Sequence, residues 1–312
     1  MPDIVTLTIN PAIDLWSEAE VIRPTHKIRT WNDLYDPGGG GINVARVLTN
    51  LGADVEAIAI AGGVTGALLG ELIEEARVRY RLVHTDGRTR INHVVFERRS
   101  GAEYRFVLDG PRVSPAEIEA CLRAVAEVPC RYLVASGSLP PGVPATVMAE
   151  IGRIAAASGA RYVVDTSGEA LRAALAGGGV HLVKPSLGEL QELVGEDVSD
   201  PAAQDAAAMQ LVETGRADMV AVTLGPDGAL LASRDGVLRK AALPVEVRST
   251  VGAGDSFLGA VIWSLARGES PAEALAWGVA AGAAAISQPG TKLCTRENVE
   301  RLHAPVRPAT PS

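Results

Sequence analysis

Cysteine and aromatic residues are scarce in this chain of 312 residues. Its three cysteines, Cys121, Cys130 and Cys294, form no CxxC pair. An odd and scattered set argues against a disulfide framework and a structural zinc site. Aromatic residues make up 4% of the chain and apolar residues 47%, so alanine, valine, leucine and glycine must supply the core. This composition is typical of an ordinary α/β protein, and the length allows one large domain or two smaller ones.

Positive charge and long apolar runs are also in short supply. Lys and Arg number 29 against 37 Asp and Glu, which gives a net charge of −8. Such an acidic chain is a poor candidate for non-specific nucleic-acid binding, and we expect no nucleic-acid partner. Charges interrupt every apolar run before membrane-spanning length, and the start at Met1–Val5 lacks the basic segment of a secretory signal. We therefore expect a cytoplasmic protein with no membrane partner.

Two common nucleotide-binding motifs are missing as well. No GxxxxGK[ST] occurs, which excludes a P-loop NTPase, and no GxGxxG follows the first expected strand. A dinucleotide site of the Rossmann type is therefore not expected.

Short β-branched runs alternate with longer helical patterns along most of the chain. The expected strands are Ile4–Ile9, Val55–Ala61, Tyr132–Ala135, Tyr162–Asp165, His181–Val183 and Met219–Thr223. The expected helices are Asn43–Leu51, Ala67–Glu75, Pro115–Ala126, Pro144–Ala157, Leu187–Val194 and Asp205–Glu213. This alternation predicts an α/β fold with a doubly wound, mostly parallel sheet, whose ligands bind beyond the carboxyl ends of the strands.

Two segments, 15–35 and 88–108, break this alternation and have the pattern of extended strands. Arg90–Phe96 and Glu103–Val107 flank Ser100-Gly101, as the strands of a hairpin would. We expect a small β-sheet that serves as a lid, a dimer interface or both, because a small sheet needs a partner surface. We predict a main domain at residues 1–12, 36–87 and 109–303. The lid is predicted at residues 13–35 and 88–108. A disordered proline-rich tail is predicted at residues 304–312.

The stretch Ser249–Ser256 carries the strongest chemical signal. Gly252 and Gly254 frame a turn that Asp255 closes, and apolar residues at helical spacing follow. Free amides at a helix start bind anions, and a carboxylate beside them could accept a hydroxyl proton during phosphoryl transfer. Alternatively, Asp255 only caps the helix.

Other polar stretches follow expected strands, and each has a structural alternative. Pro37–Asn43 contains four glycines that permit close approach to a ligand, or form a hinge between sheet and domain. Ser186 and Glu189 fit a capping box, or lie beside Lys184 at a phosphate and a metal. The glycines of Thr223–Gly228 suit a plain turn or a nucleotide-phosphate contact.

Basic residues gather in the expected small sheet, although the chain is acidic overall. Such residues commonly form a solvated face. Arginine also binds phosphate oxygens with two parallel hydrogen bonds, which favours an anionic substrate at the mouth of the main domain. The residues in question are Lys27, Arg29, Arg90 and Arg105.

Together these stretches resemble the PfkB, or ribokinase-like, family of carbohydrate kinases over about Ile4 to Leu302. Pro37–Asn43 resembles the first signature of the family, and Ser249–Ser256 resembles the more specific second one. Further stretches are similar to the 6-phosphofructokinase branch, and the related 1-phosphofructokinases and tagatose-6-phosphate kinases share much of them. These stretches are Thr6–Asp14, Pro37–Arg46, Ser136–Val143, Asp165–Leu171 and Gly290–Cys294.

The resemblance implies a ribokinase-like domain with a β-clasp lid that pairs with the lid of a second subunit in a homodimer. It implies Asp255 as the base for the sugar hydroxyl and the amides of Gly252, Ala253 and Gly254 as the anion site. Its implied sugar-phosphate contacts are Asp14, Gly38, Gly39, Asn43, Arg90 and Ser138, with Lys27 and Arg29 near the phosphate or across the dimer.

The resemblance also implies ATP, Mg²⁺ and a monovalent cation such as K⁺. The implied ATP contacts are Lys184, Ser186, Thr223, Gly225 and Gly228. Glu189 would organise Mg²⁺ through water, and the cation loop would involve Val251, Ala285, Gln288, Gly290 and Lys292. Two details depart from the family pattern: Ser186 replaces the Asn of an N-x-x-E motif, and Gln288-Pro289 differs from the usual cation loop.

The implied activity is that of an ATP-dependent phosphosugar kinase, with fructose 6-phosphate as the favoured acceptor and fructose 1,6-bisphosphate as the product. Related alternatives are 1-phosphofructokinase, tagatose-6-phosphate kinase and a kinase of unphosphorylated sugars or nucleosides. A non-catalytic protein that binds a phosphorylated metabolite is the alternative from another class.

Overall fold

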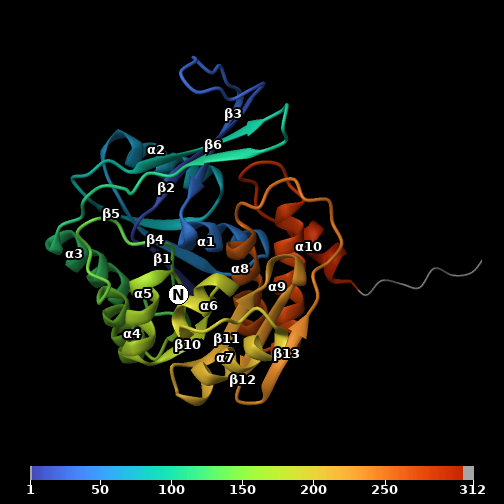
Figure 1. Ribbon diagram of the computed structural model, residues 1–312. Coiled ribbons are helices and arrows are strands. Elements are labelled where there is room, and N and C mark those ends of the chain that lie inside the picture. The colour runs from blue at the N-terminus through green and yellow to red at the C-terminus, as the bar shows by residue number, and fades with distance from the viewer. Residues whose placement is uncertain (1, 305–312) are drawn as a thin grey trace, which may run out of the picture.

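The computed structural model describes residues 2–304, which form a large sheet between two layers of helices and a separate small sheet (Figure 1). The predicted disordered tail lies outside the described residues, apart from Ala304. None of the helices in residues 2–304 combines the length and the apolar character that crossing a membrane requires.

The large sheet has nine strands. Seven consecutive strands, from β11 (Ala217–Thr223) to β5 (Arg79–His84) at one edge, run parallel to one another. An antiparallel hairpin, β12 and β13, completes one edge. In spatial order the strands are β13 (Gly236–Lys240), β12 (Ala229–Ser233), β11 (Ala217–Thr223), β10 (Val180–Val183), β9 (Arg161–Asp165), β8 (Tyr132–Ser136), β1 (Ile4–Thr8), β4 (Val55–Ala61) and β5 (Arg79–His84).

Helices cover both faces of this sheet, because successive residues of a buried strand point to opposite sides. Ile4 of β1 packs into one core and Val5 into the other. The first core contains α1 (Gly40–Asn50), α2 (Gly63–Glu75), α8 (Ala253–Ala266), α9 (Pro271–Ile286) and α10 (Arg296–His303). The second contains α3 (Pro115–Ala126), α4 (Val147–Ser158), α5 (Gly168–Gly177), α6 (Leu187–Val194) and α7 (Pro201–Glu213).

The small sheet stands at the carboxyl end of β1, and we call it the lid. Its strand order is β3 (Trp31–Gly38), β2 (Ala12–Ala19), β6 (Arg90–Glu97) and β7 (Glu103–Phe106). Ala12 pairs with Gly38 on one side and Arg90 on the other, so the lid begins immediately beside the main domain. The predicted hairpin is confirmed, since β6 and β7 pair antiparallel.

Some predicted bounds were wrong. Residues 20–30 form a loop between β2 and β3 instead of continuous strand. Helix α7 begins four residues early, because Asp200 accepts hydrogen bonds from the Ala202 and Ala203 amides and Pro201 occupies the first turn. Helix α4 begins at Val147, after a turn that contains Pro144.

Candidate active site

The start of α8 forms the centre of the site. Gly252 has φ of +71°, and a Cβ atom there would lie 2.3 Å from Leu293 Cδ2, so the turn requires glycine. No side chain caps the first amides of the helix within the described residues. The Ala253 and Gly254 backbone instead lines a cavity. Unpaired amides at a helix start give this cavity an anion-binding end.

Asp255 lies in the first turn of α8, but its side chain does not cap the helix. Its Oδ2 accepts a hydrogen bond of 2.9 Å from Nδ2 of Asn43 on α1. Burial raises the pKa of Asp255 to about 7, with a further contribution from the charge of Asp165, while Asn43 and Lys184 oppose the rise. A carboxyl with a pKa near neutrality is suited to accept a proton at physiological pH.

A buried ion pair lies beside Asp255. Lys184 Nζ is 3.0 Å from Asp165 Oδ1, at the carboxyl ends of the neighbouring strands β10 and β9. Burial is the largest single effect and lowers the pKa of Lys184, but the carboxylates of Asp165, Asp255 and Glu189 together outweigh it and raise the lysine pKa. A Cβ atom at Gly254 would be 3.5 Å from Lys184 Nζ, which places the ammonium at the start of α8. The sequence predictions missed Asp165, whose position as the last residue of β9 was the available signal.

The cavity at the start of α8 has a volume of about 530 Å³ and a mainly apolar wall. Thr223, Gly225 and Gly228 line it, as do Ala253 and Gly254 at the start of α8. Val279 and Ala283 of α9 face it from one side, and segment 242–247 from another. The structure thus brings three of the five predicted ATP contacts to one cavity that ends at the anion-binding turn.

Ser186 and Glu189 form the reciprocal capping box of α6. The Ser186 amide donates to Glu189 Oε2 at 2.7 Å, and the Glu189 amide donates to Ser186 Oγ at 3.3 Å. Ser186 also bridges to Thr223, which adjoins the cavity. Residues 2–304 contain no group of three His, Cys, Asp or Glu side chains that could hold a metal alone.

A second cavity of about 470 Å³ lies between the lid and the main domain, and Arg90, Asn10 and Ser138 line it. Arg90 donates to the carbonyl oxygens of Leu108 (2.6 Å) and Asn10 (2.9 Å), and to Ser138 Oγ at 3.4 Å. Arg90 Nε and Asn10 Oδ1 are buried and have no partner within the described residues. Because such atoms are costly to leave unpaired, they mark a place for a polar ligand.

Asp14 is the third residue of β2, and its half-buried side chain lies close to Gly38. Burial raises its pKa, although Asn92 donates to its Oδ1 at 3.0 Å. A Cβ atom at Gly38 would fall 2.1 Å from Asp14 Oδ2, so glycine leaves the space that the Asp14 carboxylate occupies. Gly39 follows with φ of +104° and leads into α1. These glycines therefore place Asp14 and Asn43 on one side of the site.

From the sequence we expected the basic residues of the lid to face the main domain, but not all of them do. Arg105 Nη2 reaches Thr250 Oγ1 at 2.6 Å, and Arg90 lines the second cavity. Lys27 and Arg29 are exposed in the loop that joins β2 to β3. That part of the expectation was wrong for the single chain, because this loop belongs to the far end of the lid (Figure 1).

The residues predicted for a cation loop fall in two neighbouring segments. The amides of Arg248 and Ser249 donate to the Ile286 carbonyl oxygen at 2.8 and 3.3 Å. Gly290 packs against Trp16, since a Cβ atom there would be 3.1 Å from the indole ring. The segment that holds Val251 thus lies beside the segment that holds Ala285, Gln288, Gly290 and Lys292.

Comparisons with known proteins show the family to which the chain belongs. Residues 4–298 match the pfkB family carbohydrate kinase. The chain is 44% identical over 303 residues to the ATP-dependent 6-phosphofructokinase isozyme 2 of Mycobacterium tuberculosis, covering 96% of this chain and 89% of the relative. It is 40% identical over 305 residues to the isozyme 2 of Escherichia coli K12, covering 97% and 99%.

Solved structures give the same result. Escherichia coli phosphofructokinase-2 in complex with fructose-6-phosphate superposes with a TM-score of 0.92 at 39% identity, covering 97% of this chain and 98% of that chain. Arabidopsis thaliana ribokinase shares the fold, with a TM-score of 0.75 at 19% identity over 97% of this chain and 98% of that chain. The expected ribokinase-like fold and the family resemblance are confirmed. The chain belongs to the pfkB family of carbohydrate kinases and is a phosphotransferase enzyme.

Proposed function

We propose that the chain transfers the terminal phosphoryl group of ATP to fructose 6-phosphate and releases fructose 1,6-bisphosphate and ADP. One observation carries the proposal: Asp255 adjoins the larger cavity and is linked by charge, through Asp14, to Arg90 in the second cavity. Gly254, its neighbour in the chain, lines the larger one. On the other side the charge of Asp14 acts on Asp255, and that of Arg90 acts on Asp14.

In this proposal the larger cavity holds the nucleotide, and its phosphates approach the amides of Ala253 and Gly254. Asp255 accepts the proton of the attacking hydroxyl as the oxygen forms its bond to phosphorus. The amides and Lys184 stabilise the negative charge on the transferred group. Asp14, Asn43 and the Gly38–Gly39 backbone would orient the sugar hydroxyls. Closure of the lid would exclude water, which competes as an acceptor.

Mg²⁺ is part of the proposal, and the acidic residues present suit a shared site better than a cage. Mg²⁺ in phosphoryl-transfer enzymes is bound by one or two carboxylates, waters and the substrate phosphates. Glu189 uses Oε2 in the capping box, so a metal-bound water would use Oε1. When bound, the ion would neutralise charge on the ATP phosphates.

A monovalent cation beside the start of α8 is a further part of the proposal. Escherichia coli phosphofructokinase-2, with a TM-score of 0.93, has been solved in complex with potassium. The neighbouring segments that hold Val251 and Gly290 offer backbone carbonyl oxygens, which suit such an ion. Turnover in K⁺ should exceed that in an equal concentration of tetramethylammonium, and equal rates in the two salts would remove the cation from the proposal.

The second cavity supports a phosphorylated acceptor. Arg90 has its Nε unpaired, and Ser138 and Asn10 stand beside it. A neutral sugar would not need the guanidinium there. Sugar 1-phosphates are the second candidate class, because 1-phosphofructokinase of Haloferax volcanii and D-tagatose-1-phosphate kinase of Bacillus licheniformis are 32% and 31% identical to the chain.

We also propose a homodimer that forms through the outer face of the lid. Large apolar side chains are exposed there, namely Tyr35, Tyr104 and Phe106, which the strand register places on one face. An exposed apolar face of a small sheet requires a cover. Pairing would also bring Lys27 and Arg29 of one lid near a second subunit. Phe106→Asp should lower the mass measured by sedimentation, whereas the exposed Val64→Asp on α2 should not.

The decisive experiment is a coupled ADP-release assay with ATP and Mg²⁺. The acceptors are fructose 6-phosphate, fructose 1-phosphate, tagatose 6-phosphate, tagatose 1-phosphate, fructose, ribose and adenosine. The highest kcat/KM should belong to fructose 6-phosphate, which would place the chain in glycolysis and hence in the cytoplasm. A clear preference for a neutral sugar would contradict the role of Arg90, and tight binding without turnover would favour a binding protein.

A further inference from the structure

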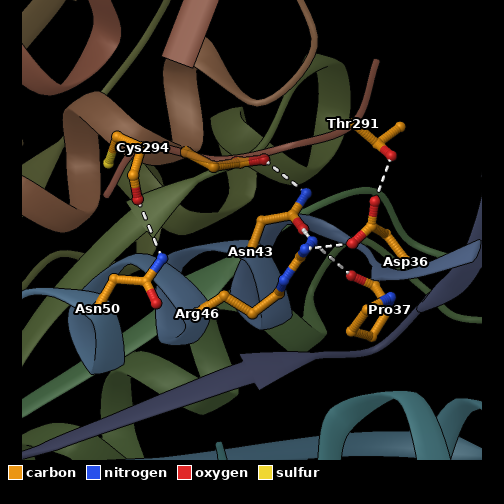
Figure 2. Close-up of polar contacts among 8 residues, drawn as sticks. Asp36, Pro37, Asn43, Arg46, Asn50, Thr291 and Cys294 are labelled. Atoms are coloured by element: carbon orange, nitrogen blue, oxygen red, sulfur yellow. Dashed lines mark hydrogen bonds and ion pairs between the residues drawn. The ribbon is translucent and has the colours of Figure 1, made fainter. Parts of the chain in front are cut away.

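Arg46 connects the hydrogen-bond partner of the proposed base to strand β3 of the lid. On α1 its Nη1 donates to Asn43 Oδ1 at 3.2 Å and to the Pro37 carbonyl oxygen at 3.0 Å. Its Nη2 donates to Asp36 Oδ1 at 2.6 Å. Figure 2 shows the guanidinium between Asn43 on one side and Asp36 and Pro37 on the other.

The contact with Arg46 fixes which way the Asn43 side-chain amide faces. A guanidinium can only donate hydrogen bonds, so it must face the carbonyl oxygen of that amide. The amide NH₂ then points the opposite way and donates to Asp255 Oδ2 at 2.9 Å. A flipped Asn43 would set its oxygen against the Asp255 carboxylate and its NH₂ against a cation. Arg46 therefore excludes the orientation that would repel an ionised base.

Arg46 is in turn held from the side of the lid. Its side chain is 12% exposed and that of Asp36 is 21% exposed, so the ion pair is largely shielded from water. Thr291 donates to Asp36 Oδ2 at 2.5 Å, which occupies the second carboxylate oxygen. Asp36 and Pro37 belong to β3 of the lid, and Thr291 belongs to the loop that follows α9 (Figure 2).

We propose that Arg46 is a positioning residue for the base, that it acts through Asn43, and that Asp36 and Thr291 hold it in place. The inference rests on the proposed role of Asp255. It makes the geometry of the base depend on where the lid strand β3 and the 287–294 loop lie. A movement of either segment would be transmitted to Asn43 and from there to Asp255 Oδ2.

The test compares Arg46→Lys with the wild-type chain. Lysine keeps the positive charge that acts on Asp14 and can still pair with Asp36. A single ammonium cannot reproduce the planar fork toward Asp36, Pro37 and Asn43. We expect kcat to fall about 10-fold to 100-fold, as for misplacement of a reacting group by about 1 Å, with the KM for ATP unchanged.

Arg239 on β13 provides a matched control. It also joins an aspartate, a proline carbonyl oxygen and a side-chain amide oxygen, namely those of Asp205, Pro201 and Gln204. Arg239→Lys thus removes an equivalent fork away from both cavities. Loss of kcat in Arg46→Lys but not in Arg239→Lys supports the proposal. Equal losses in both variants, or kcat within about twofold of wild type in Arg46→Lys, overturn it.

A second readout separates this inference from the proposed function. The carboxyl ¹³C of Asp255, assigned by its disappearance in Asp255→Asn, can be titrated by NMR without substrates. Asp165, Asp14, Lys184 and Asn43 are the groups that act on it, and only the contact with Asn43 is weakened in Arg46→Lys. Its titration midpoint should move to higher pH, because a donor to the ionised form is lost.

The outcomes are distinguishable. A wild-type chain that is silent with fructose 6-phosphate contradicts the proposed function, and the titration then decides the positioning role alone. An unchanged midpoint in Arg46→Lys overturns that role whatever the activity. If Arg46→Lys does not fold, Thr291→Val decides in its place, since it removes one hydroxyl and the outer link. We expect a several-fold loss of kcat and a smaller rise of the midpoint, and wild-type values for both would reject the proposal.

Discussion

The cavity at the start of α8 and the cavity beneath the lid differ in what their walls offer a ligand. The larger one is mainly apolar, and alanine, valine, proline and glycine supply most of its surface. The smaller one contains a guanidinium, a carboxylate, an amide and a hydroxyl, from Arg90, Asp109, Asn10 and Ser138. Apolar walls suit a flat base, whereas a guanidinium with an unpaired nitrogen suits a phosphate.

The difference teaches how one protein can bind two phosphorylated molecules in distinct places. In the proposed function the donor would be recognised through its base and would deliver its phosphates to the backbone amides of α8. The acceptor would be recognised through its charge and would present a hydroxyl to Asp255. If this division is correct, substitutions in one cavity should change the KM of one substrate alone, and a substitution between them should change kcat.

The largest effect should follow from Asp255→Asn, which leaves both cavities intact. We expect kcat to fall by roughly 10²-fold to 10⁴-fold, the usual contribution of a general base. Calorimetry should still detect binding of ATP and of fructose 6-phosphate. Near-normal turnover in this variant would remove Asp255 as the base, and lost binding of either ligand would assign it to a cavity instead.

Arg90→Ala should have the next largest effect, on the acceptor alone. Removal of one partner of a desolvated charge pair costs about 2 kcal/mol or more, so the KM for fructose 6-phosphate should rise roughly 30-fold. The KM for ATP should stay constant. Arg90→Lys is the control for charge without the planar fork and should recover part of the loss. An unchanged acceptor KM would contradict the phosphosugar assignment.

Gly282→Leu should produce the opposite pattern with a smaller magnitude. Gly282 of α9 lines the larger cavity, and a Cβ atom there would lie 3.6 Å from the nearest atom, the Ala253 carbonyl oxygen. The control Gly282→Ala should therefore be tolerated. Leucine would extend into the space for the base and raise the KM for ATP by about 10-fold. A change in the acceptor KM instead would show that the cavities are not independent.

The smallest expected effect is a dependence of kcat/KM on pH, which tests the assignment of Asp255 as the base. The base must be ionised, and burial raises the pKa of Asp255 to about 7. Since protonation inactivates it, kcat/KM should fall about tenfold for each pH unit below that value and level off above it. Arg90→Ala should retain this acid limb. The residual turnover of Asp255→Asn should lack it, and a limb that persists there would belong to another group.

The sequence predicted the parallel centre of the fold because its strands are continuous β-branched runs that are buried on both faces. It did not reveal α9, whose alanine-rich residues are apolar on nearly every side, so that no periodic pattern stands out. The weakly patterned strands β5 and β13 at the sheet edges were missed for a related reason. Edge strands have one solvated side and carry charged residues such as Arg79 and Lys240.

The glycine turn and Asp255 could be found from sequence because all their members are consecutive. Arg46 could not, since its importance depends on Thr291, which is 255 residues from Asp36 in the chain. Asp165 was missed for the same reason, because its partner Lys184 follows the next strand. Long-range pairings of this kind are set by the topology of the sheet, and local patterns do not record them.

The pairing of Ala12 with Gly38 and Arg90 has a mechanical consequence. The proposed sugar contacts Asp14, Gly38 and Arg90 lie on the first residue pairs of the lid, where rotation about its base would hardly move them. A strand of eight residues extends about 26 Å, so a tilt of about 10° would carry its outer end roughly 4 Å. The lid is in this sense a lever with a short arm at the proposed sugar contacts and a long arm at its outer edge, where Ala19 pairs with Glu97. A second subunit in contact with that edge would receive an amplified signal of whether the sugar is bound.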